Sequence, residues 1–273
     1  MTKKILILGL MAMLTVGAKA QEKHGIDTLQ CHIVGVDFGI MAPLWGTHSG
    51  GPDGGSMQEL YESPYLNFAA EWDYKFKSNW MLSLEGDIWF GYNSDNYKDR
   101  AERMGDIFAS NGLLMSWGGY NGVVTMYNRG FAVRPGVGKI IPLFRKNPDS
   151  GILLKVSGGW FMQKTIHTQD MNESYVPQLG DKMISLYDHL RNGMMFTESV
   201  GFIYMSNRNT YVNVKITFDL SECISWSSRS HVLDNLMGLN GKDENRYFDL
   251  MGAVRLSWMF PFTGKTSYDY YYY

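Results

Sequence analysis

Hydrophobic and polar residues alternate along several segments of the chain. Between residues 65 and 74 every second residue is apolar, the positions between are mostly polar, and the pattern repeats between residues 80 and 90. A period of two residues is that of a β-strand with one apolar face. The link 75–79 is short enough for a hairpin turn, so the two segments are predicted to pair.

Eight segments have this pattern or a less regular version of it. The regular ones are 65–74, 80–90, 211–220 and 251–260, and the less regular ones are 32–41, 129–141, 152–166 and 194–205. In the segment 194–205, Glu198 shares a face with Val200 and Phe202, so the pattern requires a bulge or a rim position there. The sequence therefore predicts an all-β protein with eight strands.

The lengths of strands and links predict how the strands are arranged. Strands of about ten residues exceed the five or six that are usual in soluble sheets and match the roughly 9–11 that cross a membrane at a tilt. The links alternate between long (43–62, 91–128, 167–192, 221–245) and short (75–79, 142–150, 206–209). This alternation is typical of outer-membrane barrels, and a closed sheet leaves no unpaired edge in lipid. We expect an eight-stranded antiparallel transmembrane β-barrel with short periplasmic turns and long extracellular loops.

The N-terminus has the parts of a secretory signal peptide. Two lysines precede the apolar run 5–14, and Ala-Lys-Ala at 18–20 is a small-x-small cleavage site. The run is shorter than the roughly 20 residues of a membrane helix. The expected organisation is a signal peptide (1–20), a periplasmic N-terminal segment (21–30), the barrel (31–262) and a tyrosine-rich tail (263–273).

Composition argues against several other classes of protein. The 273 residues include 25 basic and 27 acidic side chains, with no dense basic patch, which argues against a nucleic-acid partner. The six histidines are scattered, and Cys31 and Cys223 have no close metal-ligand spacing. We expect no metal and no cofactor. The predicted topology places the two cysteines on opposite sides of the membrane, so we also expect them to stay unpaired.

Together these features resemble the small eight-stranded outer-membrane barrels of Gram-negative bacteria, the OmpA and OmpX type. The resemblance covers residues 31–262 and includes the terminal segment LMGAVRLSWMF at 250–260. Within this type the chain is similar to barrels of Bacteroidetes, some of which accompany secretion or barrel-assembly machines. The resemblance implies a place in the bacterial outer membrane, in contact with outer-membrane lipid, and supplies no site motif.

If the aliphatic faces point toward lipid, the opposite faces carry charged side chains into the lumen. Eight strands enclose a space that side chains just fill. A buried charge is tolerated only when it is paired or hydrogen-bonded, so we interpret these residues as a charge network that plugs the barrel, with catalysis as the alternative. Its predicted members are Asp37, Glu71, Asp73, Glu85, Asp87, Arg134, Lys155, Lys215, Asp219, Asp249 and Arg255.

We expect the function of the protein to depend on its long loops. The second long loop is rich in apolar residues, including Leu114, Met115, Trp117 and Tyr120, and apolar spacing over 183–190 predicts a short amphipathic helix in the third. Such surfaces either cap the barrel mouth or bind a partner. Because long loops in compact folds are usually functional, we expect a non-enzymatic structural, accessory or interaction barrel whose loops contact another surface protein or a polysaccharide. The expected partner is a protein of the cell envelope, such as a secretion or barrel-assembly machine.

Two other functions stay open. Loop histidines and serines suit a lipid-modifying enzyme, since barrels of this size include acyltransferases and deacylases. The inward residues Trp89 and Phe161 suit a lateral channel for small apolar molecules, although the inward charges argue against it. The loop residues in question are His48, His167, His189, His231, Ser49, Ser56 and Ser230.

The last strand has the pattern of an assembly signal. Alternate apolar positions precede Pro261, which is expected to end the strand ladder. The tail 263–273 is expected at the periplasmic side, either as a handle for a partner or as an interfacial tyrosine girdle. The signal residues are Val254, Leu256, Trp258 and Phe260.

Overall fold

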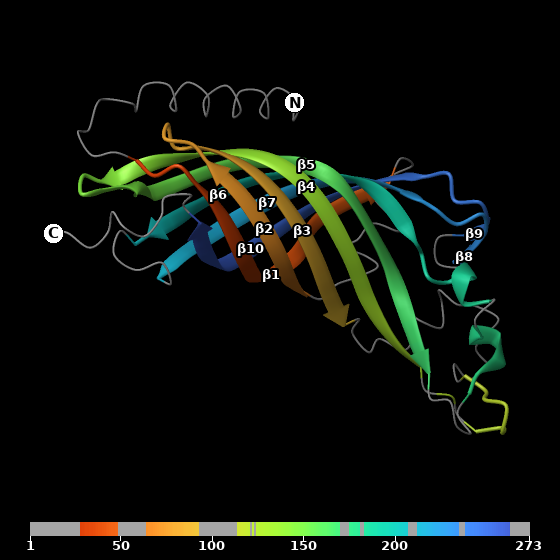
Figure 1. Ribbon diagram of the computed structural model, residues 1–273. Helices are drawn as coiled ribbons and strands as arrows, with labels where there is room; N and C mark the ends of the chain where they lie inside the picture. Colours follow the sequence, from red (N-terminus) through yellow and green to blue (C-terminus); the bar gives the residue numbers. More distant parts are fainter. Residues whose placement is uncertain are drawn as a thin grey trace.

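The computed structural model forms a closed ring of antiparallel strands (Figure 1). It describes residues 28–48, 64–92, 114–120, 122, 124–169, 175–180, 183–206, 212–234 and 238–262. The predicted signal peptide and C-terminal tail lie outside these ranges. No helix within them is long and apolar enough to span a membrane.

Eight strands form the barrel, and two short ones form a separate hairpin. The elements are β1 (Cys31–His48), β2 (Tyr65–Lys75), β3 (Trp80–Tyr92), β4 (Val124–Phe144), β5 (Asn147–Gln169), η2 (Pro177–Leu179), η3 (Ile184–Leu186), β6 (Arg191–Met205), β7 (Asn213–Ser227), β8 (Val232–Asp234), β9 (Leu239–Gly241) and β10 (Arg246–Phe262). The order around the ring is β1-β10-β7-β6-β5-β4-β3-β2, and β8 pairs with β9 alone. The predicted eight-stranded barrel is thereby confirmed.

Several strands are longer than the apolar pattern indicates. β4 and β5 have 21 and 23 residues, and the turn expected over 142–150 narrows to Arg145 and Lys146. The additional residues extend beyond the apolar stretches of these strands, so the period of two is weaker there. The expected amphipathic helix near 183–190 is instead the single 3-10 turn η3. The three-residue strands of the β8–β9 hairpin are too short to produce a periodic signal.

The ladder of β10 continues through Pro261, contrary to the sequence prediction. Pro261 is the register partner of Ile33 on β1. On the other side of β10, pairing with β7 ends at Trp258 and Val214. Proline is tolerated here because only one edge of the strand is paired at this point.

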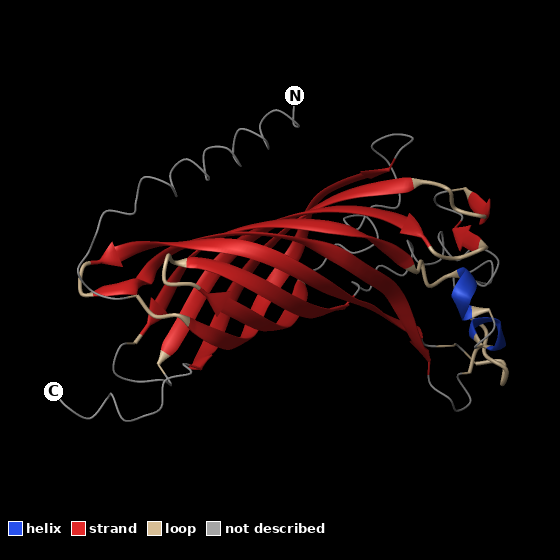
Figure 2. Ribbon diagram, turned by 45° about the horizontal axis from the view of Figure 1, so that its top comes forward, coloured by secondary structure: helices blue, strands red, loops and turns tan. Residues whose placement is uncertain are grey.

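Short turns and long loops lie at opposite ends of the barrel. The β2–β3 and β4–β5 turns are at one end, whereas η2, η3 and the β8–β9 hairpin are at the other (Figure 2). We call these the short-turn end and the long-loop end.

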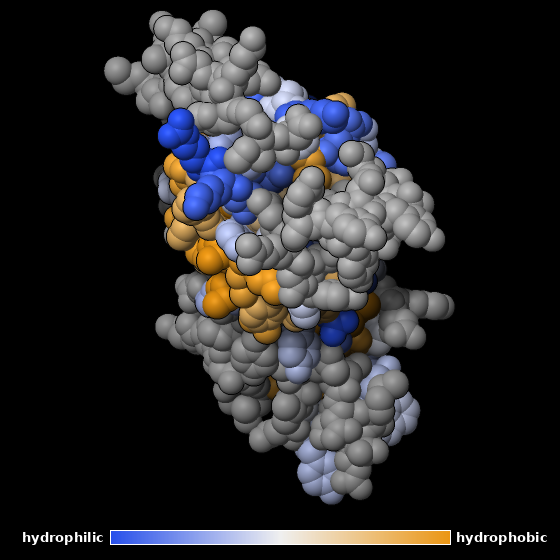
Figure 3. Space-filling view, turned by 60° about the vertical axis from the view of Figure 1, so that its left-hand side comes forward, coloured by the Kyte–Doolittle hydropathy of each residue, from blue (hydrophilic) through white to orange (hydrophobic). Residues whose placement is uncertain are grey.

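The outer surface of the barrel carries exposed apolar side chains on all eight strands. Exposed fractions reach 58% for Val36, 63% for Phe218 and 55% for Trp258, and part of this surface is orange in Figure 3. The alternate residues of the same strands are buried inside the ring. Water would not favour so large an apolar belt, and lipid would.

Glu198 lies on this outer face, in the middle of β6. The ladders to β5 and β7 pass through it without a register shift, with Val156 and Leu220 as its partners. Its neighbours Phe196 and Val200 on the same face are exposed, and Glu198 itself is half-buried. The sequence predicted a bulge or a rim position for Glu198. Both are wrong, because β6 is regular at this residue and Glu198 lies in the middle of the strand.

Candidate functional site

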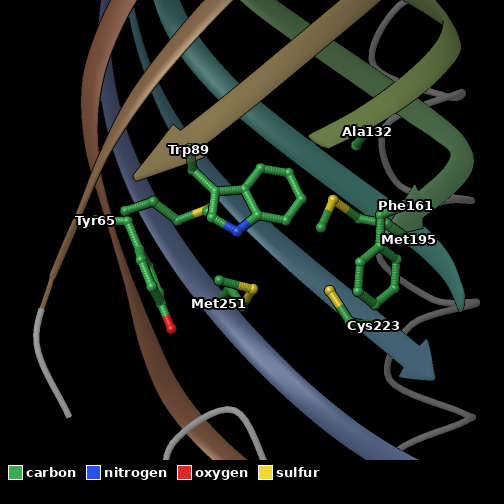
Figure 4. Close-up of a cluster of buried hydrophobic side chains, with 8 residues drawn as sticks. Tyr65, Trp89, Ala132, Phe161, Met195, Cys223 and Met251 are labelled. Atoms are coloured by element: carbon green, nitrogen blue, oxygen red, sulfur yellow. The ribbon is translucent and has the colours of Figure 1, made fainter. Parts of the chain in front are cut away.

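The lumen is filled by three layers of side chains. An apolar layer near the short-turn end consists of Cys31, Ile33, Met81, Ile140, Leu153, Ile203, Met205 and Met259. A second apolar layer near the long-loop end consists of Met41, Tyr65, Trp89, Ala132, Phe161, Met195, Cys223 and Met251 (Figure 4). Charged and polar side chains fill the space between the two layers.

Arg134 on β4 connects two carboxylates of β3 with the opposite wall. It donates to Glu85 at 2.6 Å and also contacts Asp87, and its other terminal nitrogen donates to the Thr197 hydroxyl at 2.6 Å. Thr197 in turn lies 2.8 Å from the Ser221 hydroxyl. Sequence reasoning missed these two hydroxyls, although both have the inward parity of their strands.

Arg255 on β10 is the most highly connected cation of this layer. It contacts Glu85 and Asp219, and its Nη1 lies 3.2 Å from Asp87 and 3.7 Å from Asp37. Its register partner is Gly39 of β1. A Cβ at Gly39 would lie 2.6 Å from the Arg255 Cγ, so the glycine leaves room for this side chain.

Two lysines complete the ion pairs. Lys155 on β5 donates to Glu71 and to Glu85, both at 2.8 Å. Lys215 on β7 contacts the second oxygen of Glu71. Glu71 and Glu85 each receive more than one cation, and all four side chains are essentially inaccessible to water.

The remaining predicted members of the network have weaker connections. Asp73 lies in the same buried layer, two residues from Glu71 on β2, and one of its oxygens has no hydrogen-bond partner. Both oxygens of Asp37 likewise lack a hydrogen bond. Asp249 is buried outside this layer, where its register partner is Cys223 near the long-loop end.

The apolar layer above the charges blocks the long-loop end of the lumen. The rings of Trp89 on β3 and Phe161 on β5 lie 6.4 Å apart inside the lumen (Figure 4). A Cβ at Gly130 would lie 2.3 Å from the Trp89 ring, so the indole depends on this glycine for its position. A cavity of about 10 Å³ remains between this layer and Arg255, which is room for about one water molecule.

A further buried ion pair lies at the short-turn end and was not predicted. Lys75 donates to Asp149 at 2.6 Å and to the carbonyl of Leu29 at 2.9 Å, and the Leu29 N–H donates to Asp149 at 3.1 Å. These bonds attach the chain before β1 to the barrel. Asp149 was assigned to a turn from the sequence, so no facing direction could be given to it.

Both cysteines are free thiols and buried. Cys31 begins β1 at the short-turn end, and Cys223 belongs to the apolar layer near the long-loop end. The sequence placed Cys223 in a loop after its strand, whereas β7 continues to Ser227 and turns this side chain into the lumen. The two thiols therefore lie in different layers of the lumen.

Three loops form a packed cap at the long-loop end. Its small core consists of Leu114, Val176, Leu179 and Tyr187, with Leu186 and Leu233 packed against it. Arg229 forms an ion pair with Asp188, and the hydrogen bond between them raises the pKa of Arg229 above its ordinary value.

One turn of the cap displays aromatic side chains to solvent. The Ser116 N–H donates to the Tyr120 carbonyl at 2.9 Å, and the Tyr120 N–H donates to the Ser116 hydroxyl at 3.1 Å. Gly119 adopts a φ of 77°, which a residue with a Cβ rarely does. The Trp117 N–H bonds to the Tyr175 carbonyl at 2.9 Å, yet its side chain is 83% exposed and that of Tyr120 is 61% exposed.

The loop histidines and serines are not gathered into one described site. His189 lies 3.4 Å from the fully buried Asp234, and His167 is buried. His231 and Ser230 are exposed in the link before β8. Ser49, Ser56 and the side chain of His48 lie outside the described part. Among the described residues no cluster of histidine, cysteine and carboxylate groups is arranged to hold a metal ion.

The predicted assembly-signal residues share the outer face of β10. Val254 and Leu256 are 49% and 54% exposed, and Phe260 is half-buried with its ring 5.3 Å from that of Trp258. They belong to the apolar belt.

A closed antiparallel barrel with an apolar outer belt, a filled polar lumen and loop lengths sorted by end defines a transmembrane β-barrel of the outer-membrane type. Proteins of this class reside in the bacterial outer membrane. By the usual topology of the class, the short-turn end is periplasmic and the long-loop end extracellular.

No protein-family model matches the chain, and no curated protein matches it in sequence. Among solved structures, the chain is similar to Ail, the attachment invasion locus protein of Yersinia pestis, in complex with the heparin analogue sucrose octasulfate. The identity is 7%, the coverage is 85% of this chain and 100% of that one, and the TM-score is 0.39. The outer membrane protein OprG from Pseudomonas aeruginosa has 8% identity, coverage of 88% and 99%, and a TM-score of 0.37. Neisserial surface protein A has 9% identity, coverage of 82% and 95%, and a TM-score of 0.28.

Proposed function

We propose that the protein is a non-enzymatic interaction barrel, exported by its N-terminal signal peptide, that binds a protein partner of the cell envelope through its extracellular cap. The observation that carries this proposal is the aromatic turn of the cap. Trp117 and Tyr120 are exposed, while the backbone beneath them is fixed by Ser116, Gly119 and Tyr175.

A fixed aromatic tip is suited to binding. Exposed tryptophan and tyrosine are costly in water and are the residues that most often dominate protein interfaces. Because the backbone is already ordered, a partner would not have to bear the entropic cost of ordering it.

The lumen supports an interaction role over transport. Among the described residues, its charge network is paired across the barrel and lies between two apolar layers, which argues against a path for solutes. We also propose that the network serves the barrel as a structural plug, since its four cations are paired with neighbouring carboxylates and are poorly available to a substrate.

Affinity purification from native outer membranes tests the proposal. Cross-linked wild-type protein should recover a defined envelope protein, and Trp117→Ala/Tyr120→Ala should lose most of it while folding normally. Lys242→Ala/Glu244→Ala, which removes an exposed ion pair of a neighbouring loop, is the control and should retain the partner. Equal recovery by all three proteins would contradict the proposed binding surface.

A further inference from the structure

Two cations lie side by side on the outer surface of the barrel near the long-loop end. Arg129 of β4 and Lys164 of β5 are direct register partners, and both are exposed. Their chain neighbours Asn128 and Thr165 are buried in the lumen, so the alternation of the strands turns the two cations outward. Directly opposed side chains on adjacent strands have Cβ atoms about 4.5–5.5 Å apart, so the two charges share one small area.

No carboxylate is among the outward neighbours of this pair on β3, β4 and β5. The residue opposite Arg129 on β3 is Phe90. The next outward positions on β4 and β5 are Tyr127, Phe131, Met162 and Ile166. Like charges that oppose each other across a sheet destabilise it, so an anion bound between these two would remove an unfavourable interaction.

An aromatic ring lies beside the guanidinium of Arg129. The Arg129 Cζ lies 5.6 Å from the centre of the Phe90 ring, within the range of a cation–π contact. A cation–π contact does not use up the five N–H donors of the guanidinium, so donors remain to reach an anion. A planar guanidinium of this kind matches the geometry of a phosphate group.

The pair lies just above the apolar belt. On β5 the outward residues from 152 to 162 are all apolar or glycine, and this length is the roughly 9–11 residues that a tilted strand needs to cross a membrane. Lys164 is the next outward residue. Immediately below the cations, the rings of Phe131 and Trp160 lie 5.3 Å apart, as expected of an aromatic girdle at the membrane interface.

We propose that Arg129 and Lys164 bind the phosphate group of an anionic lipid in the outer leaflet, whose acyl chains lie on the apolar surface of Phe131, Trp160 and Met162. The two cations are where a lipid headgroup would be, and the apolar residues are where its chains would be. A free phosphate ion could use only the first of these features, so the combination favours a lipid.

Native mass spectrometry in non-ionic detergent tests this site with lipids of defined structure. We expect bis-phosphorylated lipid A to bind the wild-type barrel about tenfold or more tightly than lipid A from which both phosphates have been removed. Arg129→Gln/Lys164→Gln should abolish this difference and leave binding of the dephosphorylated lipid unchanged.

The β4–β5 turn supplies a matched control. Arg145→Gln/Lys146→Gln removes the same charge from exposed residues at the other end of the same two strands, and should bind both lipids as wild type does. Inorganic phosphate at the lipid concentration should not displace lipid A. If it does, the site takes a phosphate ion and not a lipid, and the proposal is wrong.

Two more results would overturn the proposal: equal binding of the two lipids by wild-type protein, or full phosphate selectivity in the Arg129/Lys164 double variant. Heat-modifiable migration in gels reports whether each variant is folded. If the double variant does not fold, the comparison of the two lipids on the unaltered protein still decides the outcome.

Discussion

At the residue scale, the buried charged side chains are the residues that depend most on their neighbours. Glu85 receives Arg134, Lys155 and Arg255 in a part of the barrel closed to water. Desolvation makes each charge costly when it is alone, so each ion depends on its partners. Exposed ion pairs have no such dependence, because water replaces a lost partner.

Replacement of Arg255 by methionine should therefore be strongly destabilising. It would leave Asp219 without its cation and Glu85 and Asp87 with fewer partners, at an expected cost of about 3–5 kcal/mol in the free energy of unfolding. Urea unfolding in phosphatidylcholine vesicles, followed by tryptophan fluorescence, measures this cost. Lys242→Met breaks the exposed pair with Glu244 and should cost less than about 1 kcal/mol. Similar losses in the two variants would mean that the charge layer is accessible to water.

At the element scale, each strand is defined by the contrast between its two faces. β6 departs from this rule, because Glu198 faces outward between Phe196 and Val200. A carboxylate on the lipid face costs free energy, although less than a lysine or arginine there. β10 follows the rule closely, with Trp258 on the outer face and Ser257 fully buried inside.

Glu198→Leu should stabilise the barrel. Removal of the carboxylate from the lipid face should raise the free energy of unfolding in vesicles by about 1 kcal/mol, and Glu198→Gln should give a smaller gain. A loss of stability in both variants would show that the carboxylate has a favourable partner, and the lipid-facing assignment of this part of β6 would be wrong.

Trp258→Asp should reduce insertion sharply. A charge would replace a side chain that is 55% exposed on the outer face and whose ring contacts Phe260. The fraction of heat-modifiable protein in isolated outer membranes measures insertion, and Trp258→Phe is the control that keeps an apolar ring. Normal insertion of the aspartate variant would contradict a lipid-facing role for this position.

At the scale of the whole molecule, closure of the ring leaves two surfaces for function, the cap and the lipid-facing belt. Among the described residues, side chains fill the lumen at three levels, and the cavity of about 10 Å³ beside Arg255 has room for about one water molecule. The cap joins three loops through one small core, so its aromatic turn is held by neighbours distant in sequence.

The whole barrel should therefore not conduct ions at porin level. In planar bilayers, wild-type protein should show no stable openings of porin size, and neither should Trp89→Ala/Phe161→Ala. That variant opens only the layer near the long-loop end, and the charge layer and the apolar layer near the short-turn end still block the lumen. Stable large openings of the wild type would exclude a plugged lumen. Openings of the variant alone would show that Trp89 and Phe161, and not the charge layer, block the lumen.

Local sequence pattern is enough to give the class of fold and the face of each regular strand. Apolar residues such as Phe68 and Leu256 alternate with polar ones over segments long enough to cross a membrane. This pattern is local, because one face of each strand contacts lipid and the other faces the lumen along its whole length. For the same reason the inward side of Arg134 and Arg255 followed from parity alone. Local pattern could not give the partners of these residues, because pairing across a barrel depends on register and tilt, which the whole ring sets together.

Three features are visible only in the folded barrel. Arg255 reaches Glu85, and Gly39 leaves room for the Arg255 side chain. Pro261 remains in the strand ladder. Tertiary structure also decided that Arg129 and Lys164 oppose each other above the aromatic girdle and that separate loops build one cap. Each of these facts joins residues distant in sequence, and their contact energies arise only after the ring has closed.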